Sequence, residues 1–491
     1  MGLGKTVISI CAVEELVETK KVRSGLVVVP ASLKYQWAEK IEEFTGDDNY
    51  IVIDGTPAQR EEQYRWAEQH EPRYVILNYE KVRDEFNAVR RLRRDYLITD
   101  EATVYKSFKA KVSKRVKRLQ EDVEYHLGLT GQPIENQPED LFSIMQAVDP
   151  DVLGRWDYFD RLFIVRDHFG RVKRVRNLPM LWELLGDAMV RKTRYDKDVA
   201  PYMPDVEETT VPVEFDTAGA RVYRRIVRDL QVDLAQILSV GGSFDLYTHY
   251  SGGDQDTNSL RGQIMAKLTA LRMLCDHPDL VRLSADNYLD EDIQAGSEYA
   301  AALALEGVLE TLKATPKMKT CLDLVSDVLH ENPRNKVVIF STFKPTLRFL
   351  AEEFAWPSVL FTGDMNAKQK DAAKRQFATD PSTRLFLSSD AGGYGVDLPN
   401  ANYLFNYDLP WSAGKHEQRN ARIIRLSSEF DKVVLTNLVM KGSIEQRQYR
   451  MLEEKKAIAA AMVDKKGADM ARGHLVLSLE SLNQFLDDSD I

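Results

Sequence analysis

The chain has 491 residues, a formal net charge of −10, and 44% hydrophobic and 29% charged residues. This length exceeds that of one ordinary domain, so two or three hydrophobic cores are expected. The composition is that of a soluble globular protein, and no apolar run is long enough to cross a membrane. The three cysteines lie far apart at no zinc-binding spacing, and we expect reduced, buried thiols in a cytoplasmic protein: Cys11, Cys275 and Cys321.

The basic residues are unevenly distributed. A negative net charge argues against a nucleic-acid partner, but the distribution of charge matters more than its total. Lysines and arginines are concentrated between Asn87 and Arg118, and a second basic run extends from Arg166 to Arg176. Either run could neutralise a phosphate backbone, and either could equally be the solvated face of a helix.

The chain begins with the sequence Met-Gly-Leu-Gly-Lys-Thr, whose last three residues match the end of the phosphate-binding loop G-x-x-x-x-G-K-[ST]. Gly2 and Gly4 would let backbone N–H groups approach phosphate oxygens. Lys5 would bind the β- and γ-phosphates, and Thr6 would hold Mg²⁺. Apolar residues at helical spacing up to Val17 predict a helix after the loop. For so short a motif, a chance match is the alternative.

Two segments alternate short apolar strands with amphipathic helices, a pattern that predicts parallel sheets covered on both faces. Ligands of such sheets bind at the carboxyl ends of the strands. Between the segments, from about Asp216 to Glu310, the pattern is helical and includes an acidic connector. The expected strands are 26–29, 51–53, 74–77, 96–99 and 126–130 in the first segment and 337–341, 359–361, 384–388, 402–406 and 433–438 in the second.

An acidic pair follows the fourth of these strands. Asp100 would lie next to Mg²⁺, and Glu101 could orient or deprotonate the attacking water. Acidic residues commonly end strands, so the pair gains weight only because the phosphate loop lies in the same segment. In the second segment, Arg422 and Arg425 are three residues apart, which predicts that they share one helix face. Such a pair can clamp a γ-phosphate, or it can be an ordinary surface pair.

The order of these motifs resembles that of the SWI/SNF-related family of DNA-translocating ATPases, within the two-lobed, DEAD/DEAH-like helicase superfamily. The resemblance extends from residue 1 to about residue 455, and its Leu271–Pro278 segment is peculiar to this branch. The segments that carry it are 1–6, 29–37, 78–80, 100–103, 129–136, 189–194, 271–278, 315–318, 340–343, 388–398 and 418–425.

The resemblance implies the fold and the domain boundaries. The expected class is α/β, with two RecA-like parallel-sheet lobes and a helical insertion between them. The first lobe would span residues 1–215, the insertion and acidic connector 216–312, the second lobe 313–462 and a tail 463–491. Because the phosphate-loop pattern starts before residue 1, we expect the natural protein to extend upstream and this first lobe to lack its N-terminal central strand.

The resemblance also implies residue roles. Glu101 would be the catalytic carboxylate, and Arg422 and Arg425 would be arginine fingers with Gln418 beside them. Lys5, Thr6 and Asp100 would bind the nucleotide and Mg²⁺. The further expected residues are Gly395 and Asp397 at the nucleotide; Thr130, Gly131 and Gly393 in coupling to movement; and Ser32, Lys34, Ser341 and Ser389 in segments that contact the DNA backbone.

Several positions depart from the family pattern while the metal, carboxylate and arginine positions are retained, so we expect a divergent, compact member. His277 has no partner at metal-ligand spacing and is expected to have a structural role at a helix end. The departures are Thr103, Gln132, Asp397, Ile424, Ser427 and Ser428.

The resulting hypothesis is an ATP- and Mg²⁺-dependent motor that moves along or remodels double-stranded DNA through sequence-independent backbone contacts. Junctions of single and double strands are a further candidate substrate, and the expected location is the cytoplasm of a bacterium or a phage-infected cell. Two alternatives stay open: a DNA-binding protein with a defective ATPase, and an RNA-directed helicase of the same superfamily.

Overall fold

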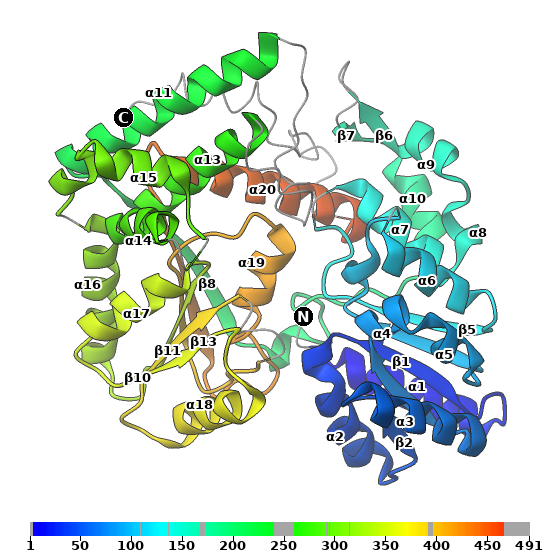
Figure 1. Cartoon of the computed structure of the whole chain (residues 1–491). Helices are drawn as coiled ribbons and strands as arrows, with labels where there is room; N and C mark the ends of the chain where they lie inside the picture. Colours follow the sequence, from blue (N-terminus) through cyan, green and yellow to red (C-terminus); the bar gives the residue numbers. More distant parts are fainter. Residues whose placement is uncertain are drawn as a thin grey trace. The chain divides into compact units, whose positions relative to one another are not determined.

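The computed structural model describes residues 3–108, 110–135, 137–166, 172–239, 260–290, 293, 295–313, 315–390 and 396–465. These residues form two compact units (Figure 1). Of the described residues, the first unit contains those up to Pro201 together with Lys455–Lys465, and the second contains those from Tyr202 to Glu454. Within the described ranges, no helix has both the length and the apolar character needed to cross a membrane.

The first unit is built on a five-stranded parallel sheet with the strand order β2-β3-β1-β4-β5. All five strands expected from the sequence are present, with ends that differ by one residue. The three inner strands are buried throughout, which explains their continuous apolar sequences. The strands are β1 (Gly25–Val29), β2 (Tyr50–Val52), β3 (Tyr74–Asn78), β4 (Tyr96–Asp100) and β5 (Tyr125–Leu129).

Helices cover both faces of this sheet. On one face, α1 (Lys5–Glu18) and α2 (Lys34–Thr45) pack through Ile10, Val13 and Trp37 against the strands. Cys11 is exposed on α1, so the expectation of three buried thiols holds only for Cys275 and Cys321. The opposite face is covered by α3 (Pro57–His70), α4 (Tyr79–Asp84), α5 (Phe86–Arg91), α6 (Lys111–Gln120) and α7 (Pro138–Val148).

The remainder of the first unit follows α7 along the chain. A short antiparallel hairpin of β6 and β7 contains part of the second basic run, of which residues 167–171 lie outside the described residues. Trp182 on α10 donates a hydrogen bond from Nε1 to the backbone oxygen of Ala461, at 3.1 Å. The elements are α8 (Pro150–Leu153), α9 (Trp156–Phe163), β6 (Ile164–Arg166), β7 (Val172–Val175) and α10 (Leu178–Leu185).

The second unit contains a six-stranded parallel sheet with the order β10-β11-β9-β12-β13-β8. Its five strands from β9 to β13 are the five expected from the sequence. The sixth, β8 (Asp205–Val213), pairs with β13 along nine residues, although the sequence placed residues up to 215 in the first lobe. The other strands are β9 (Val337–Ser341), β10 (Ser358–Phe361), β11 (Leu385–Ser389), β12 (Tyr403–Asn406) and β13 (Lys432–Met440).

Two layers of helices cover this sheet as well. On one face, α16 (Pro316–Glu331) and α17 (Lys344–Glu353) bury apolar residues against the strands. On the other face, α18 (Ala367–Thr379) packs through Phe377, and α19 (Ala413–Asn420) follows β12 in the chain.

The helical insertion has a core of its own within the second unit. Its helices pack around buried leucines together with the first turns of α20 (Ile444–Val463). The family-specific Leu271–Pro278 segment forms the end of α13 and the start of α14, where the His277 ring accepts a hydrogen bond from the N–H of Asp279 at 3.1 Å. This cap is the expected helix-end role. The helices are α11 (Thr217–Ser239), α13 (Leu260–Asp276), α14 (Pro278–Leu289) and α15 (Glu298–Leu305).

A buried ion cluster joins three elements of the second unit. The Lys317 ammonium at the start of α16 lies 2.8 Å from a carboxylate oxygen of Asp276 and 2.6 Å from one of Glu445. All three side chains are at most 3% exposed. Burial alone would lower the pKa of Lys317, but the two carboxylates hold it above its ordinary value. The cluster therefore ties α13, α16 and α20 together by charge.

Candidate nucleotide site

The start of α1 has the geometry of an anion site. Gly4 is the N-cap residue with φ +73°, and α1 has no side chain that caps its first N–H groups. A side chain would be strained at this φ, and the space where a Cβ would lie is open to 4 Å. The uncapped N–H groups and the helix dipole favour a phosphate here. Gly2 lies outside the described residues, while Lys5 and Thr6 form the first turn.

Asp100 lies at the carboxyl end of β4 and is 7% exposed. One carboxylate oxygen accepts a hydrogen bond from the Trp37 indole N–H at 2.9 Å, and the other accepts one from the backbone N–H of Glu101, also at 2.9 Å. The Tyr79 hydroxyl donates to the backbone oxygen of Asp100 at 2.6 Å. The Trp37 indole of α2 and a backbone N–H therefore fix the orientation of this carboxylate, and Tyr79 of α4 fixes the backbone of the same residue.

Glu101 has a left-handed backbone conformation, with φ +53° and ψ +56°. Non-glycine residues rarely adopt these angles, and such strain is concentrated at functional sites because the surrounding structure must impose it. The turn ends β4 abruptly and starts the short helix η2 (Ala102–Tyr105). The sequence indicated the acidic pair but could not indicate this angle.

The donor set suits Mg²⁺ better than a soft metal. A hydroxyl from Thr6 and a carboxylate from Asp100 are oxygen ligands, and Mg²⁺ usually completes its shell with water and substrate phosphates. Within the described ranges, no group of three or more His, Cys, Asp or Glu side chains could hold a metal ion. The two oxygen donors fit an ion whose remaining ligands come from a nucleotide and water.

The loop after β5 contains the expected coupling residues Thr130 and Gly131. The Thr130 hydroxyl donates to the backbone oxygen of Gln132 at 3.1 Å and accepts from its N–H at the same distance, which holds a tight turn. The backbone oxygen of Gly131 accepts a hydrogen bond from Arg191 at 2.9 Å, and Arg191 also pairs with Asp464 at 2.6 Å. Both contacts of Arg191 lie in the first unit, and neither contact was predicted from the sequence.

Of the four residues expected in DNA-contacting segments, only Ser32 is exposed. Lys34 is 4% exposed, and its ammonium lies 2.9 Å from Asp54. Ser341 is fully buried and donates to Asp408 at 2.5 Å, while Ser389 is 3% exposed. The structure therefore does not place Lys34, Ser341 or Ser389 at the surface, because each is part of the packing at the end or start of a buried element.

A buried arginine that the sequence analysis did not single out organises the second unit near these serines. The guanidinium of Arg419 on α19 lies 2.6 Å from Asp390 and donates to the backbone oxygen of Asp408, also at 2.6 Å. Burial alone would raise the pKa of Asp408, but Arg419 and Arg272 hold it far below its usual range. Asp408 in turn accepts hydrogen bonds from the N–H and hydroxyl of Thr342, both at 2.7 Å. Its position inside an arginine-rich motif could have identified Arg419 as a candidate from the sequence.

The two expected arginine fingers lie beyond α19, which ends at Asn420. The expected shared helix face is therefore not formed, because the chain turns after Asn420. Arg422 donates to the backbone oxygen of Val396 at 3.3 Å, and Arg425 forms an ion pair with Asp397. The structure thus brings two candidate residues, Arg425 and Asp397, into direct contact. Gln418 is buried on α19, and Gly393 and Gly395 lie outside the described residues.

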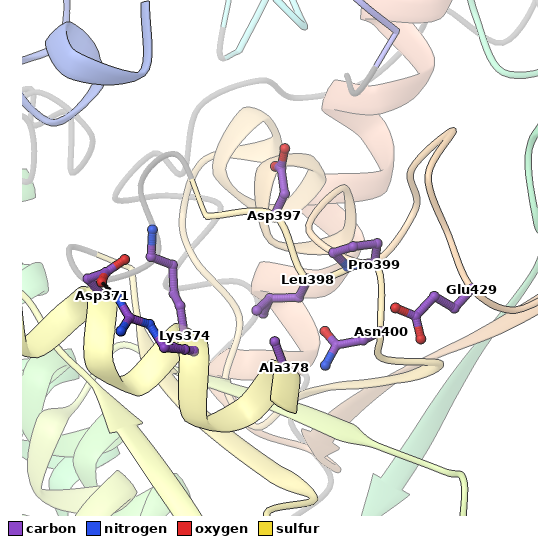
Figure 2. A pocket seen from close by; sticks show the side chains of 9 residues that line it. Asp371, Lys374, Ala378, Asp397, Leu398, Pro399, Asn400 and Glu429 are labelled. Atoms are coloured by element: carbon purple, nitrogen blue, oxygen red, sulfur yellow. Dashed lines mark hydrogen bonds and ion pairs between the residues drawn. The ribbon is translucent and has the colours of Figure 1, made fainter. Parts of the chain in front are cut away.

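A pocket of about 350 Å³ lies beside Asp397 in the second unit. Figure 2 shows side chains of α18 on one side and the 397–400 segment on the other, with Glu429 at one end. The Asn400 amide donates to the backbone oxygen of Phe377 at 3.1 Å and so holds this segment against α18. The lining residues carry both signs of charge: Asp371, Lys374, Arg375, Ala378, Asp397, Leu398, Pro399, Asn400 and Glu429.

Comparison with known proteins gives matches along the chain. The family model described as SNF2-related domain matches residues 1–280, and the model described as Helicase conserved C-terminal domain matches residues 316–427. The chain is 25% identical over 465 residues to the uncharacterized ATP-dependent helicase YqhH of Bacillus subtilis, covering 93% of this chain and 73% of that protein. It is 23% identical over 460 residues to the putative ATP-dependent helicase/translocase YwqA of the same organism, with coverage of 93% and 45%.

A solved structure also matches at low similarity. It is the Sulfolobus solfataricus SWI2/SNF2 ATPase core in complex with dsDNA, with 22% identity and a TM-score of 0.40. The match covers 100% of this chain and 92% of that one.

Proposed function

This chain belongs to the SNF2-related family of ATP-dependent helicases and translocases, and on that premise we propose that it hydrolyses ATP to move along double-stranded DNA. The observation that supports this most directly is the end of β4, where Asp100 is held by Trp37 and Glu101 takes a strained left-handed turn. An ATPase needs both an oriented metal-binding carboxylate and a second carboxylate directed at water. Asp100 and Glu101 would supply these side by side in the first unit.

The phosphate loop, the acidic pair and the arginine motif each have a role in this proposal. The N-terminal N–H groups of α1 and the Lys5 ammonium would bind the phosphates, and Thr6 and Asp100 would hold Mg²⁺, which neutralises phosphate charge when bound. Glu101 would orient the attacking water and accept its proton. Arg422 and Arg425 would stabilise negative charge on the transferred phosphoryl group, and Gln418 would support them from α19.

Double-stranded DNA is the proposed track. A motor that must pass over any sequence should bind phosphates rather than base edges, because phosphate contacts carry no sequence information. Ser32 is the exposed member of the expected DNA-contacting residues.

The test is ATP turnover with and without duplex DNA. We expect duplex DNA to stimulate turnover, and we expect Lys5→Ala and Glu101→Gln each to lower kcat by at least about a hundredfold, the scale of acid–base and phosphate contacts. Lys21→Ala and Glu121→Gln are matched controls, because both change exposed residues of the same unit. Displacement of a third strand from a triplex, without separation of the duplex, measures translocation.

Two other results would point elsewhere. Duplex DNA binding without ATP turnover in the wild-type chain would favour a DNA-binding protein with a defective ATPase. Stronger stimulation by duplex RNA than by duplex DNA would favour an RNA-directed helicase.

A further inference from the structure

A chain of hydrogen bonds lies directly under the acidic pair. The hydroxyl oxygen of Thr99, the residue before Asp100, lies 2.8 Å from the Tyr105 hydroxyl and 3.0 Å from Nε2 of His126 on β5. The other ring nitrogen of His126, Nδ1, lies 2.7 Å from the backbone oxygen of Ala147. Thr99 and Tyr105 are fully buried.

The donor and acceptor in each bond of this hydrogen-bond chain, called the relay below, follow from the chemistry of the groups. A carbonyl oxygen only accepts, so Nδ1 of His126 must carry the proton that is donated to Ala147. In a neutral ring Nε2 then accepts, so the Thr99 hydroxyl donates to it. The Thr99 oxygen is left to accept from the Tyr105 hydroxyl. One tautomer of His126 therefore satisfies all three bonds.

The ring stays neutral under ordinary conditions. Burial lowers the pKa of His126 to about 4, although its hydrogen bond to Ala147 acts in the opposite direction. A neutral ring keeps one donor and one acceptor, whereas a protonated ring would present two donors and lose the bond from Thr99.

The relay fixes both flanks of the acidic pair. Thr99 precedes Asp100, and Tyr105 closes the short helix that follows Glu101. The backbone oxygen of Tyr105 is itself fixed, because it accepts hydrogen bonds from the hydroxyls of Ser113 and Ser143, each at 2.9 Å. The turn that contains Glu101 is thus attached to β5, α6 and α7.

A glycine on β5 makes room for the relay. Gly128 pairs in register with Thr99. A Cβ at this position would lie 3.2 Å from the Tyr105 hydroxyl oxygen and 2.7 Å from a methyl group of Val148. The second distance is too short for any side chain, so a larger residue at 128 would displace its neighbours.

We propose that His126 is a positioning residue for the Asp100–Glu101 pair. By accepting the Thr99 hydroxyl, it holds the end of β4 against β5 and keeps Glu101 in the left-handed turn from which it acts on water. His126 does not touch the substrate. This inference rests on the proposed ATPase function and names a determinant of its rate.

Two substitutions of His126 separate the acceptor from the donor. Glutamine can place its amide oxygen near the position of Nε2 and accept from Thr99, whereas asparagine is shorter and reaches only the region of Nδ1. We expect His126→Gln to retain kcat within about threefold and His126→Asn to lower kcat about tenfold or more, since small displacements of catalytic groups have effects of this size. The KM for ATP should change by less than about threefold in both, because binding groups are untouched.

Thr99→Val removes the donor of the same hydrogen bond. It keeps the proposal testable even if His126→Asn fails to fold. Valine has nearly the shape of threonine but no hydroxyl. We expect Thr99→Val to lower kcat to a similar extent, and Thr99→Val combined with His126→Asn to lose no more than either alone, because groups that act through one bond are not additive. Thermal unfolding midpoints of all variants are measured alongside.

Three results would overturn the inference: equal kcat in the Gln and Asn variants, additive losses in the double variant, or losses of kcat that merely follow the unfolding midpoints. Failure of the proposed function looks different, because the wild-type chain would then show no DNA-stimulated turnover. That outcome would remove the function and, with it, any role for His126 in catalysis.

Discussion

At the scale of single residues, neighbours in the sequence have very different environments. Asp100 is buried and accepts two hydrogen bonds, while the next residue is forced into a conformation that favours glycine. Lys34 and Ser341 follow family patterns for exposed contacts, yet each is buried against an aspartate. Their partners, Asp54 and Asp408, are 20 and 67 positions away in the chain. Motif position therefore indicates chemistry, whereas exposure depends on tertiary partners.

Acid should destabilise the wild-type chain through His126. Its pKa is about 4 in the folded chain and near 6.5 when unfolded, so the unfolded state takes up a proton first as the pH falls. The stability that comes from the neutral ring is complete above pH 6.5 and is lost progressively between pH 6.5 and 4, by up to about 3 kcal/mol. Urea unfolding at pH 7.5 and 4.5 measures the change in the free energy of unfolding of the first unit, which contains His126.

His126→Gln is the control for this pH effect, because glutamine cannot take up the proton. Other carboxylates and histidines titrate in both chains, so the difference between wild type and variant isolates His126. The free energy of unfolding of the variant should fall less over this range. Parallel pH curves for the two chains would contradict the assignment of a neutral ring.

At the scale of secondary-structure elements, the hydrophobic pattern of the sequence predicted the short, apolar strands correctly. Ten expected strands are present because each is a short, buried run between amphipathic helices. β8 escaped prediction because it is an edge strand with mostly exposed residues and no apolar run. The spacing of Arg422 and Arg425 suggested a helix, but α19 ends before them. The ends of helices and the formation of edge strands depend on tertiary contacts, which cannot be read from a single sequence.

Two sets of cations in the basic run between Asn87 and Arg118 have different environments. Arg91, Arg93 and Arg94 form ion pairs with Glu68, Glu71 and Asp122. On α6, by contrast, an exposed stripe recurs at helical spacing while Ser113, Val116 and Leu119 face the core. The exposed residues of this stripe are Lys111, Lys114 and Arg118. This stripe retains the character of a phosphate-binding surface.

Replacing the three cations of the α6 stripe by alanine should weaken duplex DNA binding. Each lost phosphate contact should reduce the slope of log affinity against log salt by about 0.9, and the affinity at low salt should fall about tenfold or more. Fluorescence anisotropy over a salt series measures both. The matched control is Lys21→Ala, Arg65→Ala and Arg83→Ala, which removes the same charge from exposed positions of the same unit. An equal loss in the control would show a general charge effect.

At the scale of the whole molecule, each unit has its own apolar cores. The two clusters on the faces of the first sheet contain residues of the first unit alone. The clusters around the second sheet and the helical insertion contain residues of the second unit alone. Units with separate cores need not unfold together, so one free energy of unfolding does not describe the chain. We therefore expect two transitions in scanning calorimetry.

Lys317→Met tests this division because its effect is confined to one unit. Removal of the ammonium leaves Asp276 and Glu445 buried without their cation, which should cost about 3–5 kcal/mol. Lys441→Met makes the same substitution in the same unit at an exposed ion pair with Glu214, where solvent screening leaves little stability to lose. We expect Lys317→Met to lower the Tm of one calorimetric transition by several degrees and to leave the other unchanged, and Lys441→Met to move neither. A single transition that Lys317→Met lowers as a whole would mean that the two units unfold cooperatively despite their separate cores.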